Sequence, residues 1–433
     1  MKSIAHSRYT MRYVIIAGIS FASSSLTPAS VSARIQRDCC LQRGLEIAQE
    51  FRLGLTNRRF SPDEFWRTVD PVLTATALDS RLIGQSVQGR PIRAISFGDG
   101  ATRVLLWSQM HGNESTATMA LADLINFMAT AQGDPLWSEL RSSLTITMVP
   151  MLNPDGAQHF ERENAVGIDV NRDARRLSTP EARALKSVRD SIQPQFGFNL
   201  HDQDARTLVG SEGLQVAIAL LAPAAEESRA YDRTRQRARL VAAGVAVALR
   251  HEIPGRVAKY DDTFNPRAFG DLMQSWGTST ILIESGALPD DPQKQRLRAI
   301  NVAALLTALH EIGTEAYRGA DTLAYDRLEF NHRIPNDLLL RGGTFVTDGG
   351  AKVTADVALS YDDPVAGTGL RVRDVGDLAG QVALDTLDVA GLFLFPIGPR
   401  DDGTIGPGDP VSVTVRRGPD RFSPVVTRLG GRH

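Results

Sequence analysis

The chain has 433 residues, a formal net charge of −2 from 48 basic and 50 acidic residues, and 42% hydrophobic residues. It is longer than one small domain and too apolar for a disordered chain. The balanced charge gives no global basic surface, which argues against a nucleic-acid-binding protein. Beyond the N-terminal region no apolar run reaches the roughly 20 residues that cross a bilayer, so no membrane span is expected.

The first 33 residues have the order of a secretory signal peptide. Arg8 and Arg12 precede the apolar stretch 13–22, and small residues ending at Ala33 follow. Charged, apolar and small-residue regions in this order are typical of a signal that is removed on export, rather than of a buried N-terminal helix. We therefore expect a secreted or periplasmic protein.

Between about residues 90 and 315, short apolar runs alternate with helical patterns. The runs are nearly continuously apolar, as strands buried on both faces are, and they cover residues 91–97, 104–108, 144–151, 196–200 and 280–283. The helical patterns cover residues 115–130, 180–192, 224–252 and 291–312. This alternation predicts an α/β fold in which a mostly parallel sheet lies between helices.

The composition changes near residue 320. Residues 341–433 hold 16 of the 37 glycines and a single lysine, Lys352, and their short Val, Thr and Leu runs are separated by Gly, Asp and Pro. This pattern predicts a small all-β domain. The domain could bind a cell wall or a partner, or it could stabilise the fold. We divide the chain into a signal peptide at 1–33, an α/β domain at 40–318 and a β-rich accessory domain at 325–433.

Three of the predicted strands lead into metal-binding or acid–base side chains. The second strand is followed by His111 and Glu114, the fourth runs into His201, and the last runs into Glu284. In an open α/β sheet, chemistry collects at the carboxyl ends of the strands. His111 and Glu114 are three residues apart and so share one face at the start of a helix. Three protein ligands with a fourth position for water are the pattern of a catalytic zinc site.

Five sequence blocks, taken together, resemble a known family. They are His111-Gly112-Asn113-Glu114, Asn153-Pro154-Asp155-Gly156, Asp169-Val170-Asn171-Arg172, His201 and Thr280-Ile281-Leu282-Ile283-Glu284. In this order they are similar to the motifs of zinc metallocarboxypeptidases of the carboxypeptidase A type, the funnelin-like metallopeptidases, over roughly residues 85 to 290. The resemblance implies a mixed, mostly parallel sheet sandwiched between helices and one Zn²⁺ per chain, and it makes the α/β domain the catalytic one.

The resemblance also assigns roles to the residues nearest the metal. His111, Glu114 and His201 match the three zinc ligands, and Glu284 matches the general base that works with the zinc-bound water. Asp169 matches a carboxylate that orients the first histidine. This is physically reasonable, because a ligating histidine usually donates its other N–H to a carboxylate or a carbonyl.

Further roles concern the substrate. Arg162 lies where the family has an arginine that polarises the scissile carbonyl, and a guanidinium there would stabilise the developing oxyanion. Asn171 and Arg172 match the pair that binds the terminal carboxylate of the substrate. Arginine can hold a carboxylate with two parallel hydrogen bonds, which lysine could not reproduce. The implied substrate is a peptide with a free C-terminal carboxylate.

Two parts of the family pattern are less well defined. The family usually has a mobile tyrosine some twenty residues before the base, and Tyr260 is a better match for it than Tyr231 because it lies 24 residues before Glu284. The pocket for the terminal side chain should come from the stretch between Tyr260 and Glu284. An apolar Phe269 or a charged Arg267 or Asp271 could define that pocket, and the sequence leaves this choice open.

The leading hypothesis is a zinc carboxypeptidase that hydrolyses the C-terminal peptide bond of peptides. An alternative is a zinc amidase that acts on murein peptides or N-acyl amino acids, since those substrates also carry free carboxylates. A non-catalytic binding protein with the same fold is disfavoured, because all three ligand positions and the base position are occupied by suitable residues.

Overall fold

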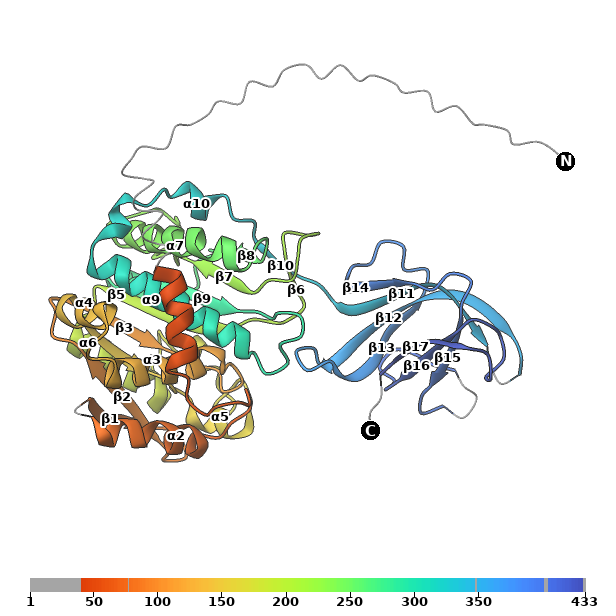
Figure 1. Ribbon diagram of the computed structural model, residues 1–433, viewed down its shortest axis with the longest axis horizontal. Coiled ribbons are helices and arrows are strands. Elements are labelled where there is room, and N and C mark those ends of the chain that lie inside the picture. The colour runs from red at the N-terminus through yellow and green to blue at the C-terminus, as the bar shows by residue number, and fades with distance from the viewer. Residues whose placement is uncertain (1–39, 77, 347–348, 401–403, 431–433) are drawn as a thin grey trace, which may run out of the picture.

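The structure, a computed structural model, describes residues 40–76, 78–346, 349–400 and 404–430. The predicted signal peptide at 1–33 lies outside the described residues. An α/β domain and a C-terminal β domain lie side by side along the longest axis of the molecule (Figure 1). The predicted fold class, an α/β domain followed by a β-rich unit, is confirmed.

A helix over residues 40–50 opens the described chain. The following helices are α2 (Pro62–Ala75), α3 (Thr116–Thr130), α4 (Pro135–Ser143), α5 (Pro154–His159), α6 (Pro180–Ile192), α7 (Arg233–Glu252), α8 (Phe269–Ser275), α9 (Gln295–Gly313) and α10 (Leu323–Asp326), with 3-10 turns η1 (Val170–Arg172) and η2 (Ala316–Gly319). The strands of the α/β domain are β1 (Asp79–Gln85), β2 (Pro91–Phe97), β3 (Thr102–Trp107), β4 (Leu144–Val149), β5 (Phe196–Asp202), β6 (Thr207–Val209), β7 (Ile218–Leu221), β8 (Val257–Lys259) and β9 (Ser279–Ser285).

The central sheet has eight strands in the order β1-β2-β4-β3-β5-β9-β7-β8. Its middle strands β4, β3, β5 and β9 run parallel to one another, whereas β1, β2 and β7 pair with antiparallel neighbours. In the parallel pair β5–β9, His201 lies directly opposite Glu284. The carboxyl ends of β3, β5 and β9 therefore meet at one edge of the sheet, as the strand-end pattern requires.

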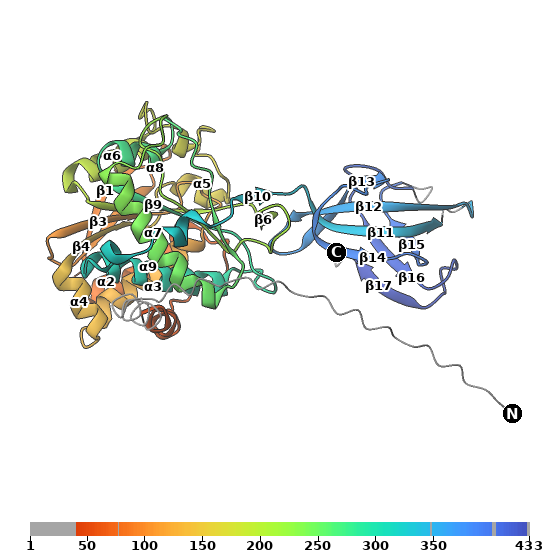
Figure 2. The ribbon, with the colours of Figure 1, turned by 90° about the horizontal axis from the view of Figure 1, so that it is seen from above.

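Both faces of the sheet are covered by helices. One core packs α3, α7 and α9 against one face, and a second core packs α6 and α8 against the other (Figure 2). A fully buried ion pair joins α3 to α9, because both Arg298 and Asp123 are 0% exposed and Arg298 Nε donates to Asp123 Oδ2 at 2.7 Å. Among the described residues, no helix is long and apolar enough to cross a membrane.

Two helices begin later than the sequence pattern predicts. The pattern at 224–252 becomes α7 only from Arg233, because Asp232 caps this end and accepts from the backbone N–H of Arg235 at 2.7 Å. The pattern at 291–312 becomes α9 only from Gln295. Asp291 stays outside the helix, and its carboxylate accepts the N–H groups of Gln295, Arg296 and Leu297. A carboxylate that accepts backbone N–H groups marks the start of each helix, and the periodicity of apolar residues does not reveal these starting points.

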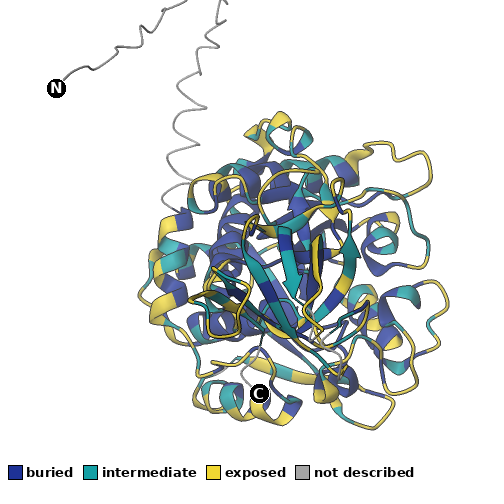
Figure 3. Ribbon diagram, turned by 90° about the vertical axis from the view of Figure 1, so that its right-hand side faces the viewer, coloured by how far each residue is buried: buried dark blue, intermediate teal, exposed yellow. Residues whose placement is uncertain are grey.

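The C-terminal β domain is a seven-stranded sheet. Its strands are β11 (Asn336–Val346), β12 (Lys352–Asp363), β13 (Thr368–Gly376), β14 (Ala383–Asp388), β15 (Phe393–Ile397), β16 (Ser412–Arg416) and β17 (Val425–Leu429). Buried positions alternate with partly exposed ones along β16, whereas β11 and β12 each contain a continuous buried run. Figure 3 shows the domain from its free end, coloured by burial. Before it, the short strand β10 (Asn331–Arg333) pairs with β6 and joins the two domains.

Candidate active site

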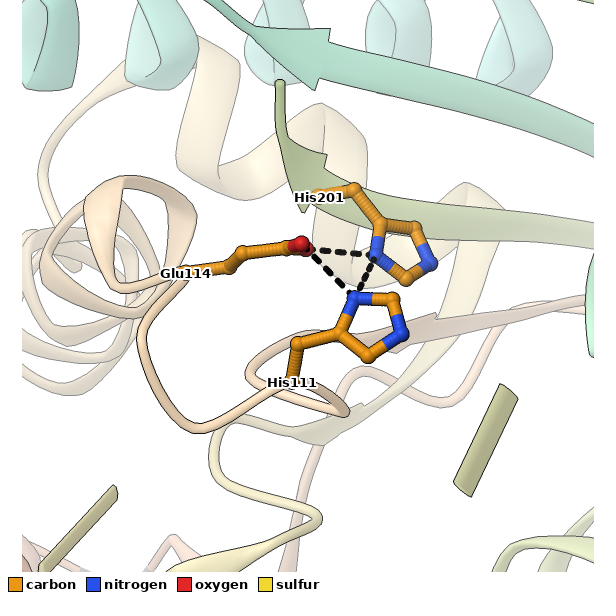
Figure 4. A group of neighbouring side chains, drawn as sticks. All are labelled: His111, Glu114 and His201. Carbon is orange, nitrogen blue, oxygen red and sulfur yellow. Dashed lines mark hydrogen bonds and ion pairs between the residues drawn. The ribbon is translucent and has the colours of Figure 1, made fainter. Parts of the chain in front are cut away.

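Three side chains converge where β3 and β5 end. His111 Nδ1 lies 2.7 Å from Glu114 Oε1, His201 Nδ1 lies 2.7 Å from Glu114 Oε2, and the two Nδ1 atoms are 3.2 Å apart. All of these ligand atoms lie within 4.8 Å of one another and point toward a common centre (Figure 4). The three residues are buried, so the cluster is shielded from bulk water.

The loop that carries His111 and Glu114 folds tightly against the turn at Asn153. Gln109, two residues after β3, adopts φ +47° and redirects the chain, and its side-chain amide donates to the carbonyl of Gly112 at 2.9 Å. A Cβ atom at residue 112 would lie 1.9 Å from the carbonyl carbon of Gly156. Only glycine allows this close approach, which explains the glycine between the two ligands.

The outer nitrogen of each histidine has a partner of its own. His111 Nε2 lies 3.0 Å from Asp169 Oδ1, and His201 Nε2 lies 3.4 Å from the amide nitrogen of Asn171. Asp169 also accepts the backbone N–H of Asn171 at 2.8 Å, which fixes the carboxylate. These contacts leave both Nδ1 atoms directed at Glu114, in the orientation that a shared metal ion requires.

The electrostatics of the cluster fit a cation. Burial acts to lower the pKa of His111, but the carboxylates of Glu114 and Asp169 outweigh it and raise that pKa to about 9. Burial lowers the pKa of His201, which favours the neutral imidazole that binds metals. The proton that His111 binds so tightly places a positive charge between two carboxylates, and a divalent ion held by the same donor set would supply that charge instead.

Glu284 lies beside this cluster on β9. Its residue is 8% exposed, and it lines the same cavity as His111 and Glu114. Burial and the nearby carboxylate of Glu114 raise its pKa well above the usual range of a glutamate. A carboxylate in such a place accepts a proton readily, as a general base must.

Arg162 bridges two of the buried acids. Its guanidinium donates to Glu114 Oε1 at 3.1 Å and to Asp169 Oδ2 at 3.0 Å, and its side chain remains 39% exposed to the cavity. The backbone of Arg162 is also anchored, because its carbonyl accepts from the side-chain amide of Asn153 at 3.4 Å. The predicted oxyanion residue thus lies next to the metal-binding cluster and faces solvent on one side.

Asn171 and Arg172 lie in the turn η1 and line the same cavity. The side-chain oxygen of Asn171 accepts the backbone N–H of Phe269 at 2.9 Å, so the turn is tied to the start of α8. Arg172 is half-buried, and one of its nitrogens donates to the carbonyl of Asn171 at 3.0 Å. Its remaining N–H groups can bind an anion that enters the cavity.

Of the two candidate tyrosines, Tyr231 and Tyr260, only Tyr260 lines the cavity. The carboxylate of Glu284, together with burial, raises the pKa of its phenol, so Tyr260 remains a hydrogen-bond donor. Tyr231 instead packs under the guanidinium groups of Arg235 and Arg239, 4.2 and 4.4 Å from its ring centroid. Tyr231 is absent from the residues that line the cavity.

The cavity has a volume of about 560 Å³, and its lining distinguishes between the residues that the sequence offers for a side-chain pocket. Gly270 and Asp271 line it together with Leu282, whereas Phe269 is fully buried behind them and packs edge-on against Trp276. Sequence spacing alone could not distinguish these neighbours, because α8 begins at Phe269 and turns that side chain into the core.

Two cavity residues had no sequence signal. Asn331 and Arg333 come from β10, next to the C-terminal β domain, yet they line the cavity with Gln203 and Asp204. The amide of Asn331 donates to Gln203 Oε1 at 2.8 Å, and Arg333 pairs with Asp204 at 2.7 Å. The pairing of β10 with β6 brings them there across more than 120 residues of sequence.

Residues 76–208 match the zinc carboxypeptidase family (Peptidase_M14). Carboxypeptidase 2 of Trichophyton rubrum is 29% identical over 109 residues, which cover 25% of this chain and 20% of that protein. The match therefore spans about a fifth of the length of the fungal relative.

Two solved structures align with part of this chain. One is a metallo-carboxypeptidase from Burkholderia cenocepacia, with a TM-score of 0.48 and 21% identity over 60% of this chain and 70% of that one. The other is bovine thrombin-activatable fibrinolysis inhibitor, with a TM-score of 0.48 and 14% identity over 60% of this chain and 98% of that one. The family match over residues 76–208 agrees with the resemblance seen in the sequence blocks.

Proposed function

We propose that the protein is a secreted or periplasmic zinc-dependent carboxypeptidase that removes C-terminal residues from peptides. One observation carries the proposal: His111, Glu114, Glu284 and Arg172 line a single cavity at the carboxyl edge of the parallel strands. Metal-binding side chains, a proton acceptor and a guanidinium that can bind a carboxylate thus face the same cavity. The signal-like residues 1–33 support export, and we assign catalysis to residues 40–318.

The metal ion in this proposal is one Zn²⁺ per chain. Two imidazole Nδ1 atoms and one carboxylate are ligands that zinc prefers, and three protein ligands leave room for water or substrate. A bound zinc ion lowers the pKa of water toward 7 and polarises a carbonyl. Asp169 accepts from His111 Nε2 and thereby fixes the ring with Nδ1 toward the metal position.

Glu284 is the proposed general base. It accepts a proton from the attacking water and then passes that proton to the amine of the departing residue. Its position opposite His201 in the β5–β9 register holds it beside the metal cluster without a flexible loop. Its raised pKa makes the ionised carboxylate a stronger proton acceptor than an ordinary glutamate.

Arg162 and Arg172 act on opposite ends of the scissile bond. The exposed edge of the Arg162 guanidinium stabilises the negative charge that develops on the carbonyl oxygen. Arg172 binds the terminal carboxylate of the substrate, and the amide of Asn171 assists it. Hydrogen bonds hold η1 to α8 and to Asp169, so Arg172 stays at a fixed distance from the metal position. A peptide whose terminal carboxylate is bound by Arg172 can therefore present only its terminal peptide bond to the metal.

Tyr260 completes the proposed site as a substrate-binding residue. Its phenol lines the cavity beside Glu284 and stays protonated, so it can donate a hydrogen bond to the substrate backbone.

Mass spectrometry of a mixed peptide library after incubation with the purified protein tests this function. We expect products that lack single C-terminal residues, with intact N-termini. Internal cleavage products or loss of N-terminal residues would contradict the proposal and would favour an endo-acting amidase or an aminopeptidase. A Glu284→Gln protein prepared in parallel is the control for contaminating proteases.

A further inference from the structure

The C-terminal β domain contacts the α/β domain through ion pairs at two places. At the first, Arg206 pairs with Asp337 at 3.3 Å and also donates to the carbonyl of Tyr361. At the second, the carboxylate of Asp363, at the end of β12, forms ion pairs with Arg58 and Arg59. The end of the domain that bears Asp337 and Asp363 therefore faces the α/β domain, and the opposite end points away from it (Figures 1 and 2).

Asp363 is well placed to hold two guanidinium groups. Its side chain is 16% exposed, and its Oδ1 accepts the backbone N–H groups of Val365 and Ala366, which fixes the carboxylate in its own turn. Oδ2 is thereby directed at Arg58 and Arg59. A carboxylate that is fixed in this way fixes its partners more firmly than a flexible surface acid would.

The two arginines in turn cover the ring of Phe160. The guanidinium carbons of Arg58 and Arg59 lie 5.4 and 4.8 Å from the ring centroid. Phe160 ends α5 with φ +56°, a left-handed conformation that costs a bulky residue free energy. Such a conformation persists only where surrounding contacts hold it, and the contact of the ring with the two guanidinium groups is one of them.

Phe160 begins the loop that follows α5 and carries Arg162. Two residues after it comes Arg162, whose guanidinium bridges Glu114 and Asp169. Arg58 also contacts the loop of the metal ligand Glu114, because its backbone carbonyl accepts a hydrogen bond from the hydroxyl of Ser115, the next residue, at 2.5 Å. Contacts from Asp363 thus lead to Arg162 and to the loop of Glu114.

We propose that Asp363 is a positioning residue for the active site: it holds Arg58 and Arg59 against Phe160 and thereby fixes Arg162. The inference rests on the proposed function, in which Arg162 stabilises the oxyanion. The C-terminal β domain then completes the catalytic domain instead of serving only as a binding module. Because Arg162 acts in the transition state, loosening it lowers kcat and leaves KM nearly unchanged.

Steady-state kinetics on a peptide with a free C-terminus test the proposal in the full chain. Asp363→Asn should lower kcat by about 3- to 30-fold, the range of coupling effects transmitted through packed contacts, with KM within twofold and the zinc content unchanged. Asp363→Glu keeps the charge and should recover most of the rate. Asp362→Asn is the matched control, because the neighbouring Asp362 pairs with Arg371 inside the β domain at 2.7 Å; it should retain the wild-type kcat.

A second pair of variants examines the route through Phe160. Phe160→Leu removes the ring, so adding Asp363→Asn to it should cause little further loss of kcat. If Asp363→Asn does not fold, Arg59→Gln weakens the same contact at a half-exposed position and should lower kcat in the same direction. An unchanged kcat in Asp363→Asn or Arg59→Gln, or an equal loss in Asp362→Asn, would overturn the inference. An inactive wild-type protein would instead contradict the proposed function.

Discussion

Replacement of Glu284 by glutamine separates chemistry from binding more cleanly than any other change at the site. Glutamine has nearly the same shape, so the β9 register opposite His201 and the metal cluster should persist. It cannot accept the proton of the attacking water. A positioned acid–base group contributes about 10²- to 10⁴-fold in rate, which equals roughly 2.7 to 5.5 kcal/mol of activation free energy.

The same substitution has a defined effect on stability. Burial and the carboxylate of Glu114 raise the pKa of Glu284 in the folded protein, so the folded state disfavours its ionised form. The contribution of this group to stability is therefore present below the pKa of an unfolded glutamate and is lost as the pH rises through the folded pKa. We expect the metal-free Glu284→Gln protein to be at least as stable as the metal-free wild type at pH 7, with no gain near pH 4.

The assay combines three measurements on the purified variant: the rate of C-terminal residue release, the zinc content and the denaturant midpoint. The expected result is a rate below 1% of wild type with one zinc per chain, and an unchanged or higher denaturant midpoint when the metal-free variant is compared with the metal-free wild type. A variant with full zinc content that retains more than a tenth of the wild-type rate would show that Glu284 is not the base.

Three further predictions address the other parts of the site. His201→Ala removes one of three protein ligands, so metal analysis should find far less than one zinc per chain; full occupancy would refute the ligand assignment. Arg172→Ala and C-terminal amidation of the peptide should each lower kcat/KM at least about 30-fold, because removing one partner of a buried charge pair costs about 2 to 5 kcal/mol. Since both changes remove the same contact, their effects should not add; additive losses would place the carboxylate elsewhere. Burial raises the pKa of Asp271 to about 6, so its contribution to stability is lost as the pH rises through that value. Asp271→Asn should therefore stabilise the protein at pH 8, by about 1 to 3 kcal/mol in urea unfolding, and leave it unchanged near pH 4; equal effects at both pH values would refute this account.

The strands that position the site could be predicted because they are short and buried on both faces. Their near-continuous apolar runs are recognisable without any long-range information, and parallel neighbours bring their carboxyl ends to one edge. His111 follows β3, His201 and Glu284 lie near the carboxyl ends of β5 and β9, and the three residues lie close together in the structure. The roles of these residues remain predictions that the variants above can test.

Other features depend on contacts that local sequence does not encode. β7 inserts antiparallel beside β9, and its four residues resemble any short buried run. The choice between Phe269 and Asp271 as pocket residue depends on where α8 begins, which a spacing count cannot fix. Arg333 enters the cavity only because β10 pairs with β6, far away in the sequence.

The central claim, a metal-dependent exopeptidase, is tested most directly with one peptide in two forms. The protein is dialysed against a chelator and then assayed on the free-acid peptide and on its C-terminal amide, before and after addition of one equivalent of Zn²⁺. Mass spectrometry should show no reaction before addition, and loss of one C-terminal residue from the free acid after it, with the amide cleaved at least about 30-fold more slowly. Activity that survives chelation, or equal cleavage of the acid and the amide, would contradict the account.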